Sequence, residues 1–138
     1  KTNNLLKIRS NYPKSLNDKQ ICNYMITILS KENLNTIEKG YYGAYLVISA
    51  NHTWNPIDKL NTFKKGKIEL ENAIKQDSKN VELRFLRLSI QANVPKILNY
   101  DQNIKSDLIF IKEHKDKIQS NQLLKMVNEI IIKAENSN

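Results

Sequence analysis

Two arginines lie three residues apart in the stretch NVELRFLRLSIQANVP, residues 80–95. Arg84 and Arg87 stand out because lysine supplies nearly all of the other positive charge, and Arg9 is the third arginine. A guanidinium group is a planar fork of five N–H donors that binds carboxylates through paired hydrogen bonds. The pair therefore predicts a site that recognises a carboxylate, either of this chain or of a ligand.

The two arginines occupy a strip between two apolar stripes of one helix. At about 100° per residue, the first stripe is Val81, Phe85, Leu88 and Ala92, and the second is Leu83, Leu86 and Ile90. Arg84, Arg87 and Gln91 lie between them and must face a seam between helices. In one alternative, which we favour, they pair with an acid of this chain, from the set Glu71, Asp77, Asp101 and Asp107. In the other, the seam is an open groove and the arginines bind an anionic group such as a peptide carboxylate.

A second set of candidate residues is aromatic. Tyr41, Tyr45, His52 and Trp54 come close together in the sequence, and tyrosine and tryptophan are enriched at binding hot spots. The alternative is that these side chains pack at the edge of the core. The candidate binding residues are Arg84, Arg87, Gln91, Tyr41, Tyr45, His52, Trp54 and Tyr100.

Enzyme motifs are missing from the sequence. It has no phosphate-binding loop, no pair of histidines at metal-ligand spacing and no nucleophile elbow. Cys22 is the single cysteine, which excludes an intramolecular disulfide and a cysteine-based metal site. We therefore expect no catalytic residues, no metal and no cofactor. An enzyme with an unrecognised site stays the third functional alternative.

The charge of the chain leaves a further alternative open. The formal net charge is +8 and the pI is about 9.5, which fits a binder of anionic polymers such as nucleic acid or surface polysaccharide. Nucleic acid is not expected, because the lysines are scattered from Lys7 to Lys133, whereas such binding needs a continuous cationic stripe that follows the phosphates.

Six helices should position these residues. The first is expected from about Leu16 to Lys31 after a cap at Ser15 or Asn17, with residues 1–14 irregular. The others are expected over 36–51, from Pro56 to about Asp77, from Val81 to before Pro95, after a cap at Asp101, and after a cap at Ser120. Asn35 with Glu38 forms the pattern of a capping box. The chain of 138 residues is expected to be one all-α domain of antiparallel helix hairpins.

Small residues mark where two helices should come very close. Gly40 and Gly43 lie on one face of the second predicted helix. Glycine inside a helix costs up to about 1 kcal/mol relative to alanine. Two glycines on one face therefore indicate that another backbone packs against them.

The segment from Gly66 to Phe85 resembles a tetratricopeptide repeat. Gly66, Leu70 and Ala73 match the small and large positions of the second repeat helix, and Asp77-Ser78-Lys79-Asn80 matches the turn, with serine in place of the usual proline. The number of residues between Gly43 and Gly66 is about twice the number that a standard repeat allows between the matching positions of its two helices. The resemblance implies a tetratricopeptide-like bundle or short right-handed solenoid that binds a protein or peptide without enzymatic activity.

The chain also resembles a group of small secreted bacterial proteins, through NHTWNPIDKL, KNVELRFLRLSIQANVP and ILNY. This resemblance implies an extracytoplasmic protein whose signal peptide has been removed. A sequence that begins at Lys1 fits this and equally fits a boundary placed within a longer chain, so a cytoplasmic location stays open. No apolar run approaches the roughly 20 residues of a membrane helix. The expected partner is thus a protein or peptide, and the oligomeric state is open.

Overall fold

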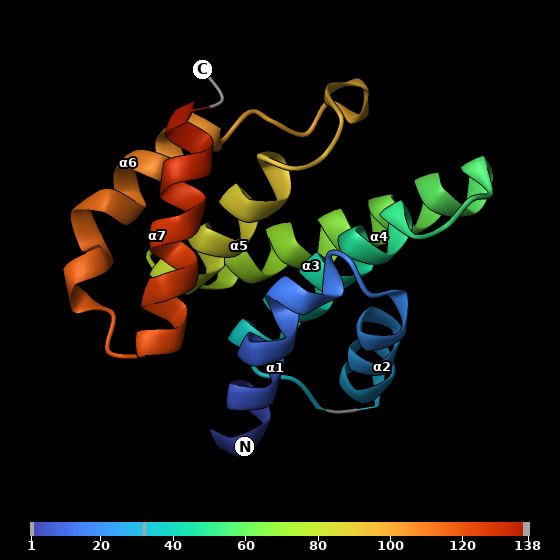
Figure 1. The fold of residues 1–138 in the computed structure, drawn as a ribbon, viewed down its shortest axis with the longest axis horizontal. Coiled ribbons are helices and arrows are strands. Elements are labelled where there is room, and N and C mark those ends of the chain that lie inside the picture. The colour runs from blue at the N-terminus through green and yellow to red at the C-terminus, as the bar shows by residue number, and fades with distance from the viewer. Residues whose placement is uncertain (1, 32, 137–138) are drawn as a thin grey trace. The chain divides into compact units, whose positions relative to one another are not determined.

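The computed structural model describes residues 2–31 and 33–136, which form seven α-helices, two short 3-10 helices and no strand (Figure 1). The elements are α1 (Thr2–Ser15), α2 (Lys19–Ser30), α3 (Thr36–Asn51), α4 (Pro56–Gln76), α5 (Val81–Gln91), η1 (Lys96–Leu98), α6 (Ile104–His114), η2 (Lys115–Lys117) and α7 (Asn121–Asn136). The predicted all-α fold is confirmed.

The N-terminal segment is a helix, not the irregular segment that we expected. Pro13 lies inside α1, in its last turn, where it removes a single backbone donor instead of preventing the helix. Ile8 and Tyr12, four residues apart, bury the inner face of α1. The next helix consequently begins later than predicted: Asp18, and not Ser15 or Asn17, caps α2.

Four of the other predicted helix starts are confirmed, and one of them is the start of α5 at Val81 after the cap residue Asn80. Asn35 and Glu38 form the reciprocal hydrogen bonds of a capping box at α3. The Asn55 side chain accepts from two amides of α4, and the Ser120 hydroxyl accepts from the amide of Leu123 at α7. The predicted cap at Asp101 is wrong, because α6 begins after Asn103.

The chain divides into two compact units, Lys1–Asp77 with α1 to α4 and Ser78–Asn138 with α5 to α7. We call them unit 1 and unit 2 and describe each separately. A single domain over residues 1–138 stays a prediction, since two compact units can still unfold together.

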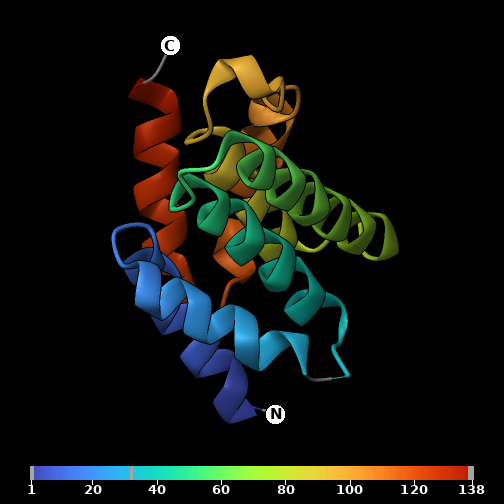
Figure 2. The same ribbon diagram turned by 90° about the vertical axis from the view of Figure 1, so that its right-hand side faces the viewer.

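In unit 1, α3 and α4 form an antiparallel pair whose backbones touch (Figure 2). A methyl group added at Gly43 would lie 2.6 Å from the carbonyl oxygen of Gly66, and one added at Gly66 would lie 2.6 Å from the carbonyl oxygen of Gly43. Only glycine at both positions permits this approach. The close contact predicted for Gly40 and Gly43 is confirmed at Gly43, where the partner is Gly66.

In unit 2, α5 packs against both α6 and α7. Nine of its residues, from Glu82 to Gln91, are buried. α5 is therefore the central helix of this unit, as its two apolar stripes indicate, and its polar residues need partners inside the fold.

Candidate functional site

The arginine pair binds a carboxylate of this chain. Arg87 donates from Nε to Asp107 Oδ2 at 2.7 Å and from Nη2 to Asp107 Oδ1 at 2.9 Å. Arg84 donates from Nη1 to Asp107 Oδ1 at 3.1 Å. The Asp107 side chain is fully buried, and the Arg87 side chain is 9% exposed. Asp107 is therefore the partner among the four acids considered from the sequence. The two arginines face this buried carboxylate and not an open groove.

The rest of the Arg84 side chain is also engaged. Its Nε donates to the carbonyl oxygen of Ser78 at 2.9 Å, and its guanidinium group lies 4.4 Å from the centre of the Phe110 ring. The His114 ring stacks on Phe110 with centroids 4.1 Å apart. Arg84 thus joins the turn before α5 to the outer side of α6, which is a structural role.

Gln91 lies at the end of α5 and holds the start of α6. Its Nε2 donates to Asn103 Oδ1 at 3.1 Å, and its Oε1 accepts from the backbone amide of Asn103 at 2.8 Å. The amide groups of a helix start need acceptors, and Asn103 itself provides no side-chain cap. Gln91 therefore replaces a local cap with a long-range one.

The predicted aromatic set, Tyr41, Tyr45, His52 and Trp54, divides between the core and the surface. Tyr41 and Tyr45 are fully buried, where both rings make edge contacts with Tyr12. The Tyr45 hydroxyl donates to the carbonyl oxygen of Ile8 at 2.6 Å. Neither side chain can contact a partner in this conformation, so a recognition surface does not include them. Tyr100 is buried as well, at 2% exposure.

His52 and Cys22 each form a hydrogen bond to a backbone carbonyl oxygen of another helix. The Nε2–H of His52 donates to the carbonyl oxygen of Ser15, the last residue of α1, at 2.8 Å, and this satisfies one of the carbonyls that every helix end leaves without a donor. The Cys22 thiol donates to the carbonyl oxygen of Tyr45. Burial raises the pKa of this thiol to about 12, so it is protonated and unreactive at neutral pH.

Trp54 is the predicted site residue that the structure leaves on the surface. Its side chain is 87% exposed. An exposed tryptophan becomes informative where further exposed apolar side chains lie beside it. Trp54 lies in the connection between α3 and α4, directly before the cap residue of α4.

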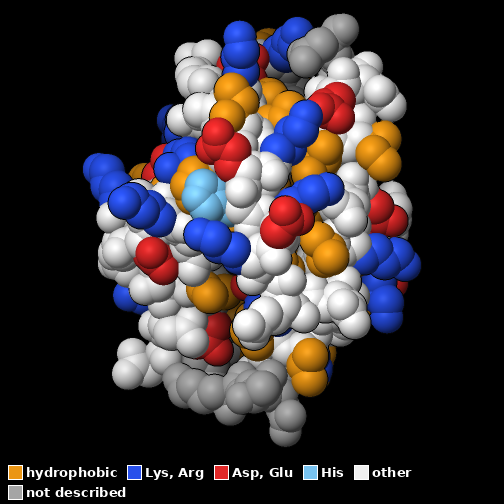
Figure 3. Space-filling view, turned by 90° about the vertical axis from the view of Figure 1, so that its left-hand side faces the viewer, with side chains coloured by type: hydrophobic (Ala, Val, Ile, Leu, Met, Phe, Trp, Pro, Cys, Tyr) orange, Lys and Arg blue, Asp and Glu red, His pale blue; other side chains and the backbone are white. Residues whose placement is uncertain are grey.

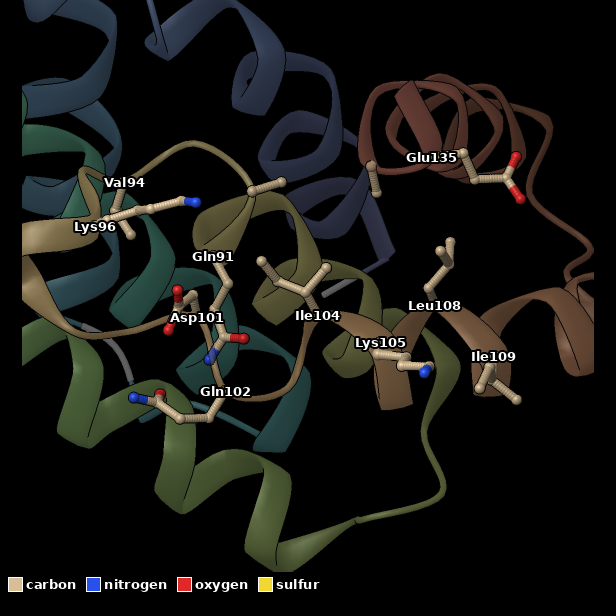
Figure 4. A pocket seen from close by; sticks show the side chains of 12 residues that line it. Gln91, Val94, Lys96, Asp101, Gln102, Ile104, Lys105, Leu108, Ile109 and Glu135 are labelled. Carbon is tan, nitrogen blue, oxygen red and sulfur yellow. The ribbon is translucent and has the colours of Figure 1, made fainter. Parts of the chain in front are cut away.

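A groove in unit 2 was not found from the sequence. It has a volume of about 870 Å³ and lies between the end of α5, the connection to α6, α6 itself and the end of α7 (Figure 4). Its lining residues are Gln91, Ala92, Val94, Lys96, Asp101, Gln102, Ile104, Lys105, Leu108, Ile109, Ala134 and Glu135. The sequence pattern of α6 could have indicated this groove. Its apolar residues cover more of the helix surface than one core-facing stripe needs: Ile104, Leu108, Ile109 and Ile111.

Apolar side chains form the floor of the groove and charged side chains form its rim. Ile104 and Leu108 are half-buried and project from α6 toward the end of α7, while Lys96 and Glu135 lie at opposite ends (Figure 4). Glu135 accepts from Lys112 at 2.5 Å. Within the described part of the chain, Lys96 and Lys105 form no ion pair. The groove therefore has an apolar floor and two available cations.

The surface charge is mixed on the side that carries α6 and α7. Lysine and arginine side chains alternate there with acidic, apolar and uncharged ones, without a continuous cationic stripe (Figure 3). No group of three or more His, Cys, Asp or Glu that could hold a metal ion occurs among the described residues. In the same residues, no helix is both long and apolar enough to span a membrane.

Comparisons with known proteins give no match: no family model, no curated protein and no solved structure is similar to this chain. The likeness to tetratricopeptide repeats and to small secreted bacterial proteins stays a prediction from the sequence. The function must therefore be inferred from the geometry alone.

Proposed function

We propose that the protein is a non-enzymatic binding module that holds a short peptide segment of a partner protein in the groove of unit 2. The observation that carries this proposal is the groove itself, with its volume of about 870 Å³, aliphatic floor and charged rim. This volume lies within the usual range of ligand sites, roughly 300–1,000 Å³, and accommodates several side chains of a peptide.

The floor indicates what anchors the ligand. Val94, Ile104 and Leu108 offer aliphatic carbon and no buried donor or acceptor that a polar ligand group would need. Binding free energy here comes from removing apolar surface from water, roughly 25 cal/mol per Å². An aliphatic or aromatic side chain is the matching anchor.

The rim indicates the charge of the ligand. Lys96 and Lys105 are exposed and form no ion pair in the described part of the chain, whereas Glu135 is paired with Lys112. An acidic side chain or carboxylate beside the anchor therefore finds two available ammonium groups. Rim charges of this kind contribute more to orientation and association rate than to affinity.

The lining also favours binding over catalysis. Its described residues include no histidine, cysteine, serine or threonine, and the two acids Asp101 and Glu135 lie in different parts of the groove (Figure 4). Nucleophilic catalysis needs a nucleophile beside a base, and acid–base catalysis needs titratable groups that both reach the reacting atoms of one substrate.

A selection with random peptides displayed on phage tests the proposal. We expect the enriched peptides to share an aliphatic or aromatic anchor next to Asp or Glu, and to bind in solution with a Kd on the order of 1–100 µM. Ile109→Asp, at a 51% exposed groove position, should weaken binding at least about tenfold.

Ile132→Asp is the matched control. Ile132 is 60% exposed, lies in the same unit and does not line the groove, so binding should stay within about twofold of the parent. Equal losses in both variants, or no loss in Ile109→Asp, would contradict the proposal. If heparin binds instead, with an affinity that falls steeply with salt, the function is that of an anionic-polymer binder.

A further inference from the structure

The connection between α3 and α4 ends in an exposed apolar tip, which we call the α3–α4 tip and define as residues 54–60. Trp54 is 87% exposed, Ile57 is 71% exposed and Leu60 is 42% exposed. Apolar side chains scattered singly on a surface are ordinary, but three within seven positions, one of them tryptophan, mark an interaction site.

The tip lacks cover because α4 begins before the core does. α4 starts at Pro56, and its first buried residue is Phe63, about two helical turns later. In Figure 1 the connection lies at the outer end of the α3–α4 pair. The first two turns of α4 therefore project from unit 1, and Ile57 and Leu60, three residues apart, lie on one face of the projection.

Positive charge follows the apolar residues along this helix. Over residues 54–65 the chain has Lys59, Lys64 and Lys65 against Asp58 as the single acid. Lys64 is exposed and lies on the face of Ile57 and Leu60, about 10 Å along the helix from Ile57. A cation at this distance behind an apolar tip fits the depth at which lipid phosphates lie above the acyl chains.

We propose that the α3–α4 tip inserts into the surface of an anionic lipid membrane. Trp54 and Ile57 enter the boundary between headgroups and acyl chains, where the amphipathic indole ring is favoured. Lys64 and its neighbours contact the anionic headgroups, and the net charge of +8 attracts the whole chain to such a surface.

A second copy of the chain fits the tip less well than a membrane. The three side chains offer on the order of 400 Å², which is well under the roughly 800 Å² per partner of a stable protein interface. Two identical tips would also bring Lys59, Lys64 and Lys65 against themselves. Insertion of a projecting tip into lipid needs neither a large flat area nor a charge of opposite sign on another tip.

The fluorescence of Trp54 tests this proposal directly, because it is the single tryptophan of the chain. The full chain is titrated with phosphatidylcholine vesicles that contain about one third phosphatidylglycerol. We expect the emission maximum to move to the blue as the indole ring leaves water. With pure phosphatidylcholine vesicles, the apparent affinity should be at least about tenfold lower.

Two aspartate variants separate the tip from the rest of the surface. Ile57→Asp should lower vesicle affinity at least about tenfold. The variant keeps Trp54 as the fluorescent reporter, and an acidic residue in the first turn of α4 stabilises the helix. Ile97→Asp changes an isoleucine of unit 2 that is 90% exposed, and it should leave vesicle affinity within about twofold. Far-ultraviolet circular dichroism confirms that both variants stay folded.

Three results would overturn the proposal. They are the absence of a blue shift with anionic vesicles, vesicle affinity that is unchanged in Ile57→Asp, and a blue shift that grows with protein concentration without lipid. The last would identify a second copy as the occupant. Peptide binding in the groove of unit 2 does not involve Ile57, so these outcomes are distinguishable from a failure of the proposed function.

Discussion

Unit 1 and unit 2 join their helices in different ways. In unit 1, α3 and α4 approach until Gly43 and Gly66 touch through their backbones. In unit 2, α5 and α6 are joined by Arg84 and Arg87, which share the buried carboxylate of Asp107. The first contact depends on the absence of side chains and the second on two of the largest.

This difference predicts opposite weaknesses. A glycine contact has no room for an added carbon atom, but no charge is lost when it is disturbed. A buried ion cluster tolerates small changes of volume, but the loss of its shared carboxylate leaves the guanidinium groups without that partner in a medium of low polarity. Unit 1 should therefore be sensitive to added volume and unit 2 to lost charge.

The largest effect is expected for Asp107→Ala. It removes the acceptor of three hydrogen bonds and leaves Arg87 buried without its carboxylate, so the free energy of unfolding should fall by about 3–5 kcal/mol. Urea unfolding followed by circular dichroism measures this loss. A loss under about 1 kcal/mol would show that the cluster is not important for stability.

Gly43→Ala should follow, with a net loss of about 1–3 kcal/mol. The new methyl group would meet the Gly66 carbonyl oxygen and the Leu70 amide nitrogen, both at 2.6 Å, and the helices must separate. The better helix propensity of alanine recovers up to about 1 kcal/mol. Urea unfolding decides the sign: a variant that is more stable than the parent would show that the helices are not in contact here.

Alkaline pH should weaken unit 1 through Cys22. Burial raises the pKa of this thiol from 9.0 to about 12. Above pH 9 the unfolded thiol loses its proton while the folded thiol keeps it, so stability is complete below that pH and falls as pH rises toward 12. The slope approaches about 1.4 kcal/mol per pH unit for one such group.

Cys22→Ala provides the control for the alkaline effect. Urea unfolding at pH 8 and at about pH 10.5 should show a smaller loss in the variant than in the parent. Burial also raises the pKa of Tyr45, so part of the loss should remain at the upper end of this range. Equal pH dependence of the two proteins would exclude Cys22 as its origin.

The smallest effect is expected for Lys112→Ala. Its ion pair with Glu135 has a nitrogen–oxygen distance of 2.5 Å, but the two side chains are 49% and 44% exposed. Exposed pairs contribute roughly 0–1 kcal/mol because water already solvates both charges. Urea unfolding should detect almost no change, and a loss as large as that of Asp107→Ala would contradict the distinction between buried and exposed pairs.

Local signals predicted the helices, and long-range contacts decided the site. The bounds of α3 follow from Asn35, Glu38 and the apolar pattern, which all lie within a few residues of each other. The sequence indicated that Gly43 packs against a backbone, but not that this backbone belongs to Gly66. The sequence also limited the carboxylate partner of the arginines to four acids. It could not select Asp107 among them, because the position of a residue on a helix gives the direction of its side chain and not the group that it contacts.

The N-terminal helix and the groove show the limits of local patterns. Pro13 suggested a boundary, although α1 continues through it to Ser15 with the loss of one backbone donor. The groove combines residues of α5, the connection that contains Lys96, α6 and α7. No single segment contains its pattern, so only the packing of the helices shows it.

A double-mutant cycle on Arg87 and Asp107 tests the central claim most directly. Urea unfolding would compare the parent with Arg87→Met, Asp107→Leu and the combined variant. Asp107→Leu leaves Arg87 buried without its carboxylate, and Arg87→Met leaves the buried Asp107 with Arg84 alone. The two separate losses should therefore exceed the loss in the combined variant by several kcal/mol, on the order of 3. Arg84, 20% exposed, can turn toward water in the combined variant. Losses that simply add would contradict the claim that the arginine pair belongs to the fold.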